Sequence, residues 1–496
     1  MALSKYILLK KVSRCAYLFL FVIIFAHSTV AASFWDFNPN EQKAYQYIIS
    51  LRPSLASPYL EPDRPASLYL QNLTASISLL INEDPDKYEK YETHFKDRLD
   101  YIDEQETNDP YKTFYLAELH LQHAFVNLKM GNQWTAAWDL RKTYKLIKSN
   151  IQKHPHFIPN YKSMGLLHVM VGSIPEKHQW FINLLGMQGS VTTGVEEIKR
   201  VAQSDNLFAL EAKVISDMLD AYVLNKADRA VRNFKETVSD HPDNLLFAYL
   251  HISMLIKNSQ GSAAIQQLKA AQQLQKKDHY ENFNMLNYLA GEIYIQKGEY
   301  ALSRNYYQAF IDHSKGQNLI KDAYYKIFLT YWLTGNEQQS LQAYEEAQVN
   351  GNTLVEADKH AERILEQKEF PNPVIMKVRL YTDGGFYDEA KALINSDPKF
   401  DYKKERVEFD YRKARLYHKQ GDLDSAITYY AMVINATDDE PWYWAPNSCL
   451  QLGYIYHTKG DISLARYYFN EVLGYRNHEY KGSLDNKAKT ALAAYE

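Results

Sequence analysis

One glycine-centred pattern recurs through the C-terminal half of the chain and constrains the fold more than any other feature. The glycines are Gly298, Gly335, Gly385, Gly421 and Gly460, which are 37, 50, 36 and 39 residues apart. Five places after each glycine stands a small residue: Ser303, Ser340, Ala390, Ala426 and Ala465. Nine places after it stands a large apolar residue: Tyr307, Tyr344, Ile394, Tyr430 and Phe469. Four places before it stands a tyrosine: Tyr294, Tyr331, Tyr381, Tyr417 and Tyr456.

These offsets predict a helical hairpin in every unit. Apolar residues at spacings of three and four give each helix one buried stripe. The glycine can end the first helix in the left-handed conformation, and the small residue lets the two helix backbones approach closely. A single hairpin cannot bury its own apolar face, whereas stacked hairpins can. We therefore predict an all-α fold, an α-α superhelix built as a solenoid of hairpins.

The regions around these units fit the same prediction. The spacing of 50 residues leaves room for an extra helix over Thr353–Gln367. Upstream, Gly131, Ala136 and Leu140 repeat the three offsets, so the solenoid is expected to start near Tyr111. The chain has only 19 glycines and 16 prolines among its 496 residues, and alternating β-type runs are hard to find. Long helices with short connections fit this composition better than many short strands.

The units resemble the tetratricopeptide repeat from Met285 to about Val472. Gly291 and Gly453 stand at the small position of the first helix, and Ala347 stands near the end of the second. This chain departs from the usual pattern at four places, where larger or more polar residues stand: Ser303, Ser340, Phe328 and Val378. The resemblance implies a superhelix that binds protein partners.

A second resemblance concerns two other segments. Gly165–Ile198, with a break at Pro175 and a glycine-rich turn, is similar to a segment of the tetratricopeptide-39-type proteins. The C-terminal "SLDNKAKTALAAY" is similar to the last helix of that family. This resemblance implies an adaptor without a known reaction.

We divide the chain into four parts on these grounds. Residues 1–32 form a signal peptide, and residues 33–107, with Pro53, Pro58, Pro62 and Pro65, form an N-terminal helical cap. Residues 108–280 form divergent helical hairpins. Residues 281–496 form the tetratricopeptide-like repeat array with a C-terminal capping helix.

The first 32 residues are typical of a secretory signal peptide. Four basic residues (Lys5, Lys10, Lys11 and Arg14) precede the apolar run Cys15–Ala26, and Val30 and Ala32 give a small-x-small exit. The run is short for a bilayer span, which needs about 20 residues, so an uncleaved anchor is the weaker alternative. We expect an exported protein, in a periplasm or at a cell surface. After cleavage no segment is long and apolar enough to cross a membrane, and peripheral membrane association stays open.

The net charge limits which ligands are expected, and the cysteine content limits how the fold can be stabilised. Without residues 1–32 the chain keeps 52 basic and 60 acidic side chains, a net charge of −8. This balance argues against a nucleic-acid partner, which requires a basic surface. Cys449 is then the only cysteine, so no internal disulfide is expected and packing must supply the stability.

The sequence shows no motif of a known chemistry. A phosphate-binding glycine loop and a His-Glu-x-x-His sequence are both missing. His154 and His156 have no third metal ligand in view, and Cys449 fits a buried helix position. Acidic pairs such as Glu345–Glu346 and Asp438–Asp439 are most simply solvated helix faces and helix ends. We expect no enzyme, no cofactor and no metal.

Two aromatic sets are candidates for ligand binding. Trp442 and Trp444 lie between prolines in "DDEPWYWAPNS", where they could stack on a sugar, although sealing the junction between two hairpins is the favoured interpretation. The first helices of such an array line its concave side. The inward positions there predict this protein-binding groove: Tyr288, Tyr325, Trp332, Arg379, Tyr411, Arg415, His418, Tyr454 and His457.

Aromatic and cationic side chains of this kind are common interface anchors and suit an acidic peptide. The alternative is a superhelix so tight that these residues pack against one another. The function expected from the sequence is therefore an exported, non-enzymatic repeat scaffold that binds a protein or peptide in its concave groove. The alternative function is an envelope glycan-binding protein that uses Trp442 and Trp444.

Overall fold

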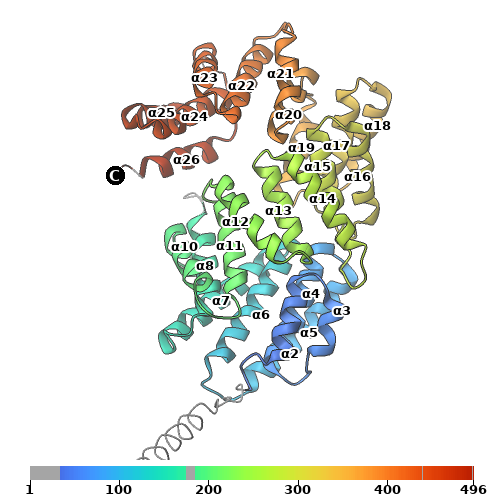
Figure 1. The fold of residues 1–496 in the computed structure, drawn as a ribbon, viewed down its shortest axis with the longest axis vertical. Helices are drawn as coiled ribbons and strands as arrows, with labels where there is room; N and C mark the ends of the chain where they lie inside the picture. The colour runs from blue at the N-terminus through green and yellow to red at the C-terminus, as the bar shows by residue number, and fades with distance from the viewer. Residues whose placement is uncertain (1–33, 175–184, 438–439, 494, 496) are drawn as a thin grey trace, which may run out of the picture.

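The computed structural model describes residues 34–174, 185–437, 440–493 and 495, and every regular element in these residues is a helix (Figure 1). The predicted all-α solenoid is confirmed. The predicted signal peptide, the Pro175 break and Asp438–Asp439 lie outside the described residues.

Prolines start the helices of the N-terminal region. Each of the first five α-helices has a proline in its first turn, where the missing N–H costs no hydrogen bond. The elements are α2 (Pro39–Ile49), α3 (Pro53–Ala56), the 3₁₀ helix η1 (Ser57–Tyr59), α4 (Pro65–Asn82), α5 (Pro85–Glu104) and α6 (Pro110–Lys129).

The middle of the chain continues as antiparallel helices. They are α7 (Gln133–Lys153), α8 (Asn160–Gly172), α10 (Val191–Ala202), α11 (Ala209–Tyr222), α12 (Ala227–Asp240), α13 (Leu245–Lys257) and α14 (Gly261–Gln275). The backbones of α8 and α10 cross closely, because a Cβ atom on Gly165 would lie 2.7 Å from the carbonyl oxygen of Gly194.

The repeat array follows. Its helices are α15 (Met285–Gln296), α16 (Tyr300–His313), α17 (Ile320–Leu333), α18 (Glu337–Val349), α19 (Glu356–Gln367), α20 (Pro373–Gly384), α21 (Tyr387–Asn395), α22 (Lys403–Gln420), α23 (Leu423–Ala436), α24 (Trp444–Thr458), α25 (Ile462–Gly474) and α26 (Lys481–Ala493). The extra helix expected over Thr353–Gln367 is present as α19, and the expected last helix is α26.

All five repeat glycines adopt the left-handed conformation that the sequence predicts. Their φ angles are 80°, 71°, 78°, 82° and 81° for Gly298, Gly335, Gly385, Gly421 and Gly460. This is a region of backbone space that glycine enters without a steric cost. Each glycine therefore ends the first helix of its hairpin.

The small positions also have the predicted role. A Cβ atom on Gly291 would lie 2.6 Å from the Tyr307 ring, and one on Gly453 would lie 2.5 Å from the Phe469 ring. Both rings are fully buried. The aromatic residue of the second helix thus fills the space that the glycine of the first helix leaves open.

A further regularity appears only in the structure. The tyrosine four places before the glycine stacks on the tyrosine eight places after it. The centroids are 5.6 Å apart in Tyr294–Tyr306, Tyr417–Tyr429 and Tyr456–Tyr468, with the rings within 4° of parallel. The units of Gly335 and Gly385 have Ala343 and Leu393 at the second position, and there the tyrosine stack is missing.

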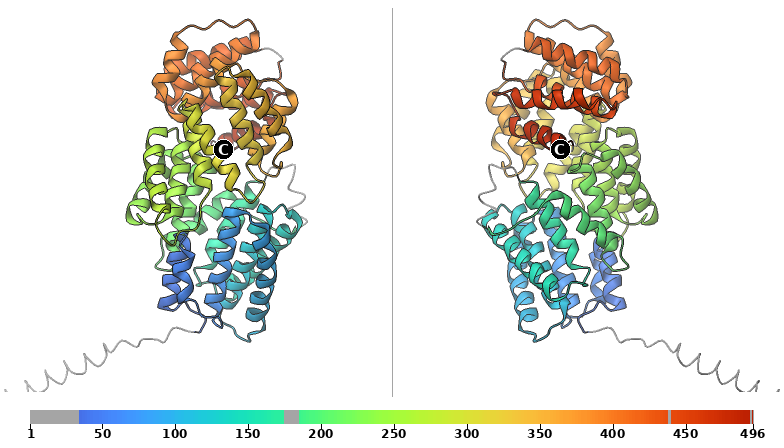
Figure 2. Two further views of the ribbon diagram at one scale, coloured as in Figure 1. Left: turned by 90° about the vertical axis from the view of Figure 1, so that its right-hand side faces the viewer. Right: turned by 90° about the vertical axis from the view of Figure 1, so that its left-hand side faces the viewer.

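The array also bends back on itself. The helix α20 packs on α15 as well as on α17 and α21. The α20–α21 turn lies against the α13–α14 turn, where a Cβ atom on Gly261 would be 2.5 Å from the carbonyl oxygen of Gly384. Figures 1 and 2 show that the C-terminal hairpins lie at one end of the molecule and that α26 runs back toward α12 and α13.

The N-terminal segment is tied to two later parts of the chain. Trp35, Phe37 and Tyr69 belong to a core that continues to Leu219. Asp84 pairs with Lys315 at 2.8 Å, and Arg52 pairs with Asp243 at 2.7 Å. The segment therefore supports the helices of the middle region and the first repeat hairpin.

Candidate functional site

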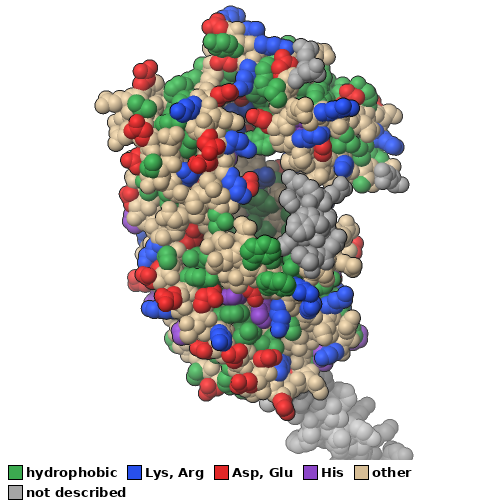
Figure 3. Space-filling model, turned by 180° about the vertical axis from the view of Figure 1, so that it is seen from behind, with side chains coloured by type: hydrophobic (Ala, Val, Ile, Leu, Met, Phe, Trp, Pro, Cys, Tyr) green, Lys and Arg blue, Asp and Glu red, His purple; other side chains and the backbone are tan. Residues whose placement is uncertain are grey.

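The candidate site is the inner surface of the bend, where α13, α20, α22 and α26 face a common space. The molecule is hollowed at its centre when it is seen from behind, and Lys and Arg side chains lie at the edge of this hollow (Figure 3). Most of the groove residues expected from the sequence lie on α15, α17, α20, α22 and α24 of this array.

Several of the aromatic groove residues pack within the array. Tyr325 is 4% exposed and Tyr411 is 3% exposed. The Tyr411 hydroxyl accepts a hydrogen bond from Asn447 at 2.6 Å. Trp332 packs against Phe370 with tilted rings and 5.3 Å between the centroids, and its indole N–H donates to a backbone carbonyl. These rings stabilise contacts between neighbouring hairpins.

A buried polar network lies beside Tyr288. The hydroxyl of Tyr288 donates to Asp322 at 2.6 Å, and Lys326 pairs with Glu292 at 2.7 Å. Burial raises the pKa of Asp322 to about 6. The hydroxyl of Tyr307 donates a short hydrogen bond to the same Glu292. These side chains satisfy one another, so this end of the predicted groove is already occupied.

The C-terminal members of the predicted groove are more accessible. Tyr454 is half-buried against Phe469, and His457 is exposed, with its Nδ1 2.6 Å from the Tyr495 hydroxyl. His418 is half-buried, and its Nδ1 lies 3.2 Å from the Tyr430 hydroxyl. Burial and the nearby positive charge of Arg415 lower the pKa of His418 to about 4, so this imidazole is neutral near pH 7.

Cations dominate the rest of the inner surface. Arg379 on α20 keeps 40% of its side chain exposed and lies 3.6 Å from Asp383. Arg412 on α22 pairs with Glu408 at 2.6 Å, and its Nε has no hydrogen-bond partner in the described residues. Arg415 donates to Gln451 at 3.1 Å. Two guanidinium groups therefore have carboxylate partners, whereas the third bonds a neutral amide.

Three lysines complete this inner cation cluster, which we define as Lys257, Arg379, Arg412, Arg415, Lys419 and Lys487. Burial lowers the pKa of Lys419, as do the positive charges of Arg415 and Lys257. Burial also lowers the pKa of Lys487, together with Lys257 and Arg415. Like charges from α13, α22 and α26 thus lie close enough to repel one another.

The side chains of Lys257, Lys419 and Lys487 are exposed to solvent. Even so, burial is the main cause of the lowered pKa of Lys419 and of Lys487. Both observations hold for a side chain that lines a hollow, because water reaches it while protein surrounds it. The acids that act on the cluster are Asp228, Asp383 and Glu408, so carboxylates are fewer than cations. The cluster therefore has a positive local potential, which favours an anionic ligand.

Sequence reasoning identified Arg379 and Arg415 and missed the other four members. Arg412, Arg415 and Lys419 are three and four residues apart, so a count of cations on one face of α22 would have found two of them. Lys257 on α13 and Lys487 on α26 lie on helices that do not belong to the five glycine-centred units. Nothing in their local sequence distinguishes them from other surface lysines.

The remaining sequence candidates lie in the core or at the surface. Trp444 is buried and Trp442 is half-buried, with 5.4 Å between their ring centroids, so Trp444 seals a hairpin junction. Cys449 is buried, which raises the pKa of its thiol to about 12. Among the described residues no group of three or more His, Cys, Asp and Glu side chains is arranged to hold a metal ion. Within the same residues no helix has the length and apolarity to cross a bilayer.

Comparison with known proteins identifies the class. The tetratricopeptide-repeat family model matches residues 411–437 and 446–478. These residues cover α22–α25 and confirm the resemblance seen in the sequence. The chain thus carries tetratricopeptide repeats over residues 411–437 and 446–478 of its α-solenoid, and arrays of this type generally bind protein partners.

A TPR repeat-containing protein of Methanocaldococcus jannaschii is similar to this chain, with 25% identity over 307 residues. The match covers 55% of this chain and 51% of that protein, so it spans about half of each.

Several solved structures match this chain at low identity. The human IFIT1 dimer with PPP-AAAA is 14% identical, with 88% of this chain and 96% of that chain covered and a TM-score of 0.34. The apo form of RapI is 14% identical, with 74% and 97% covered and a TM-score of 0.36. Yeast Tom70 is 11% identical, with 84% and 96% covered and a TM-score of 0.23. At these values the likeness carries no argument about ligands.

Proposed function

We propose that this protein is an exported, non-enzymatic scaffold that binds an acidic segment of a partner protein on its inner surface. The observation that carries the proposal is the inner cation cluster, in which cations from α13, α20, α22 and α26 outnumber the nearby carboxylates. Because these charges repel one another in the free protein, an anionic segment would relieve the repulsion on binding.

The position of the cluster supports a protein ligand. Arg412, Arg415 and Lys419 lie within the repeat matched at residues 411–437. Repeats of this type present their first helices to extended peptides or helices. Half-buried rings such as Tyr443 lie beside the cations. Arginine next to tyrosine is a common composition of interface anchors. We infer a protein segment rather than a nucleic acid, for which the net charge of the chain is unfavourable.

The test uses poly-L-glutamate as a probe of acidic character. We expect the mature chain to bind it with an affinity that falls as salt increases, because exposed charge pairs are screened. The triple variant Arg379→Gln, Arg415→Gln, Lys487→Gln should bind at least about tenfold more weakly. The matched control removes three exposed cations elsewhere: Lys142→Gln, Lys269→Gln and Lys391→Gln.

Two results would oppose the proposal. One is equal loss of binding in the triple variant and in its control, which would assign the effect to net charge alone. The other is tighter binding of polyuridylate than of poly-L-glutamate at the same salt concentration, which would favour a nucleic-acid ligand. Circular dichroism melting of each variant separates loss of binding from loss of fold.

Export is a separate part of the proposal and has its own test. We expect the signal peptide to be removed after Ala32, which leaves a protein in the periplasm or at the cell surface, with peripheral membrane contact open. Intact-mass measurement of the protein from an envelope fraction should give a chain that begins at Ser33. A chain that still carries the Cys15–Ala26 run would instead indicate an uncleaved anchor.

A further inference from the structure

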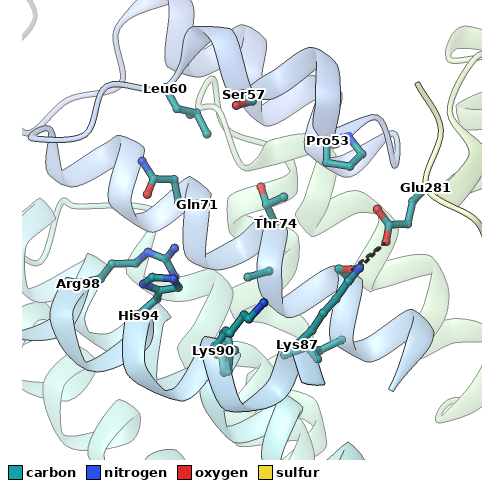
Figure 4. A pocket seen from close by; sticks show the side chains of 14 residues that line it. Pro53, Ser57, Leu60, Gln71, Thr74, Lys87, Lys90, His94, Arg98 and Glu281 are labelled. Atoms are coloured by element: carbon teal, nitrogen blue, oxygen red, sulfur yellow. Dashed lines mark hydrogen bonds and ion pairs between the residues drawn. The ribbon is translucent and has the colours of Figure 1, made fainter. Parts of the chain in front are cut away.

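A cavity of about 400 Å³ lies in the N-terminal region between α3–η1, α4 and α5 (Figure 4). Apart from Glu281, every residue that lines it comes from residues 53–98. It is separate from the inner cation cluster, which belongs to α13 and the C-terminal helices. Its size lies in the range of small-molecule sites, about 300–1,000 Å³.

One wall of the cavity is largely apolar. Pro53 and Leu60 line it from the α3–η1 segment (Figure 4). Ala75 and Leu79 of α4 line it as well. These four side chains expose no polar group to the cavity. They provide a surface against which a short hydrocarbon chain could lose its contact with water.

The opposite wall carries basic side chains at a regular spacing. Lys90, His94 and Arg98 are four residues apart on α5, so they form one stripe along the helix. The stripe extends over about 12 Å at 1.5 Å per residue. Between the two walls α4 contributes neutral hydrogen-bonding groups from Gln71 and Thr74.

The one carboxylate that lines the cavity is already engaged. Glu281 accepts hydrogen bonds from Ser78 at 2.8 Å and Asn82 at 2.9 Å, and it lies 3.8 Å from the Lys87 ammonium. Its charge therefore compensates Lys87 at one end of the cavity. Among the described residues it forms no ion pair with Lys90, His94 or Arg98.

The stripe itself lacks carboxylate partners in the cavity. Lys90 forms no ion pair or hydrogen bond with the described residues, and Arg98 donates to the neutral side-chain oxygen of Asn72 at 3.2 Å. His94 lies 4.0 Å from Asp97, which is well exposed. Burial lowers the pKa of Arg98, and the nearby Tyr91 and Asp97 offset only part of this effect.

We propose that this cavity binds an amphiphilic organic anion. Its apolar chain would lie on Pro53, Leu60 and Leu79, and its acidic head group would lie between Lys90, His94 and Arg98. A carboxylate and a phosphate monoester share this chemistry, so the head group can come from a fatty acid or from a lipid phosphate. The proposal goes beyond the scaffold function, since it uses other helices and another ligand class.

Calorimetric titration of the mature chain with dodecanoate and with dodecyl phosphate, both below their micelle concentrations, tests the proposal. We expect saturable binding of at least one of the two, and the tighter one identifies the head group. The double variant Lys90→Gln, Arg98→Gln should weaken that binding at least about tenfold. Leu60→Asn should weaken it as well, because it removes part of the apolar wall.

The matched control is Lys96→Gln, which removes an exposed lysine from α5 outside the cavity and should leave the affinity unchanged. Equal binding of dodecyl maltoside, which has no charge, would overturn the role of the cations. Equal binding of inorganic phosphate would overturn the role of the apolar wall. An unchanged affinity in the folded double variant, or a failure of both amphiphiles to bind, would also overturn the proposal.

Discussion

The two hairpins α22–α25 and the N-terminal helices α4–α11 are built from similar helices that pack in different ways. In the hairpins the tyrosine stack occurs twice at the same positions: Tyr417 stacks on Tyr429, and Tyr456 stacks on Tyr468. In α4–α11 specific polar networks join the helices. The Lys162 ammonium lies 2.9 Å from Glu118 and 3.0 Å from Glu211, and Glu41 of the preceding helix α2 binds Arg64 and Ser67 at the start of α4.

This difference explains which region can be recognised from the sequence. Contacts that recur from hairpin to hairpin need the same residue type at the same offset, so they leave a periodic pattern. A buried network needs each partner only once and leaves no pattern. The family model accordingly matches residues in α22–α25, whereas in α4–α11 only the hairpin around Gly131 repeats the glycine-centred offsets.

The largest effect that separates the regions is expected from Lys162→Met. It leaves the buried Glu118 without a cation and should lower the free energy of unfolding by about 3–5 kcal/mol. Hydrogen exchange followed by mass spectrometry should show lost protection in α4–α11 and retained protection in α22–α25. The exposed Lys142→Met is the matched control, and equal loss in both regions would break the comparison.

A pH-dependent effect of similar origin is expected at His123. Desolvation lowers its pKa, but hydrogen bonds from the imidazole to Asp139 and Glu92 outweigh this and raise the pKa to about 9. The folded pKa exceeds the unfolded value of about 6.5, so the stabilisation is complete below pH 6.5 and disappears as the pH rises through 9. The shift corresponds to about 3 kcal/mol.

Urea unfolding of the wild type should therefore show a stability that falls between pH 7 and pH 10. The variant His123→Gln should be less stable at pH 6.5, and its stability should change little over the same interval. The pKa values of Asp139 and Glu92 are lowered, so their contributions are lost in acid and do not overlap with this interval. A parallel decline in the variant would show that another group titrates.

A smaller effect is expected from Gly453→Ala in the hairpins. The added Cβ atom would lie 2.5 Å from the buried Phe469 ring, and such overpacking costs about 1–3 kcal/mol. Gly291→Ala should cost a similar amount, because the Tyr307 ring lies at 2.6 Å. Gly474→Ala is the control, since no atom lies near its added Cβ. Thermal unfolding measures all three, and unequal costs in the first two would break the equivalence of the repeats.

The smallest effect concerns the tyrosine stacks. Double-mutant cycles on Tyr417–Tyr429 and on Tyr456–Tyr468, with alanine at each position, should each give a coupling of about 1 kcal/mol. The two couplings should agree because the two geometries agree. The pair Tyr381–Leu393, which occupies the same two positions without a stack, should give less. A coupling at Tyr381–Leu393 as large as at the stacks would show that position, rather than ring contact, carries the energy.

Part of the candidate site could also be predicted from the sequence. Arg379 and Arg415 follow from counting back from the repeat glycine, because the register of a helical hairpin fixes which residues point inward. The same rule selected Tyr325 and Tyr411, which the structure buries. The helical register could not tell the accessible side chains from the buried ones, because their exposure depends on how tightly the array bends at α19 and α20.

The sequence by itself determined the local units of this protein. Three features depend only on residues close together in the chain, so their spacing in the sequence predicts them. They are the glycine in the left-handed conformation, the small residue opposite a large ring, and the inserted helix α19. The tertiary structure alone decided that α20 returns to α15, and that Lys257 and Lys487 approach Arg415. These contacts join helices far apart in the chain, and only the accumulated bend of the solenoid brings them together.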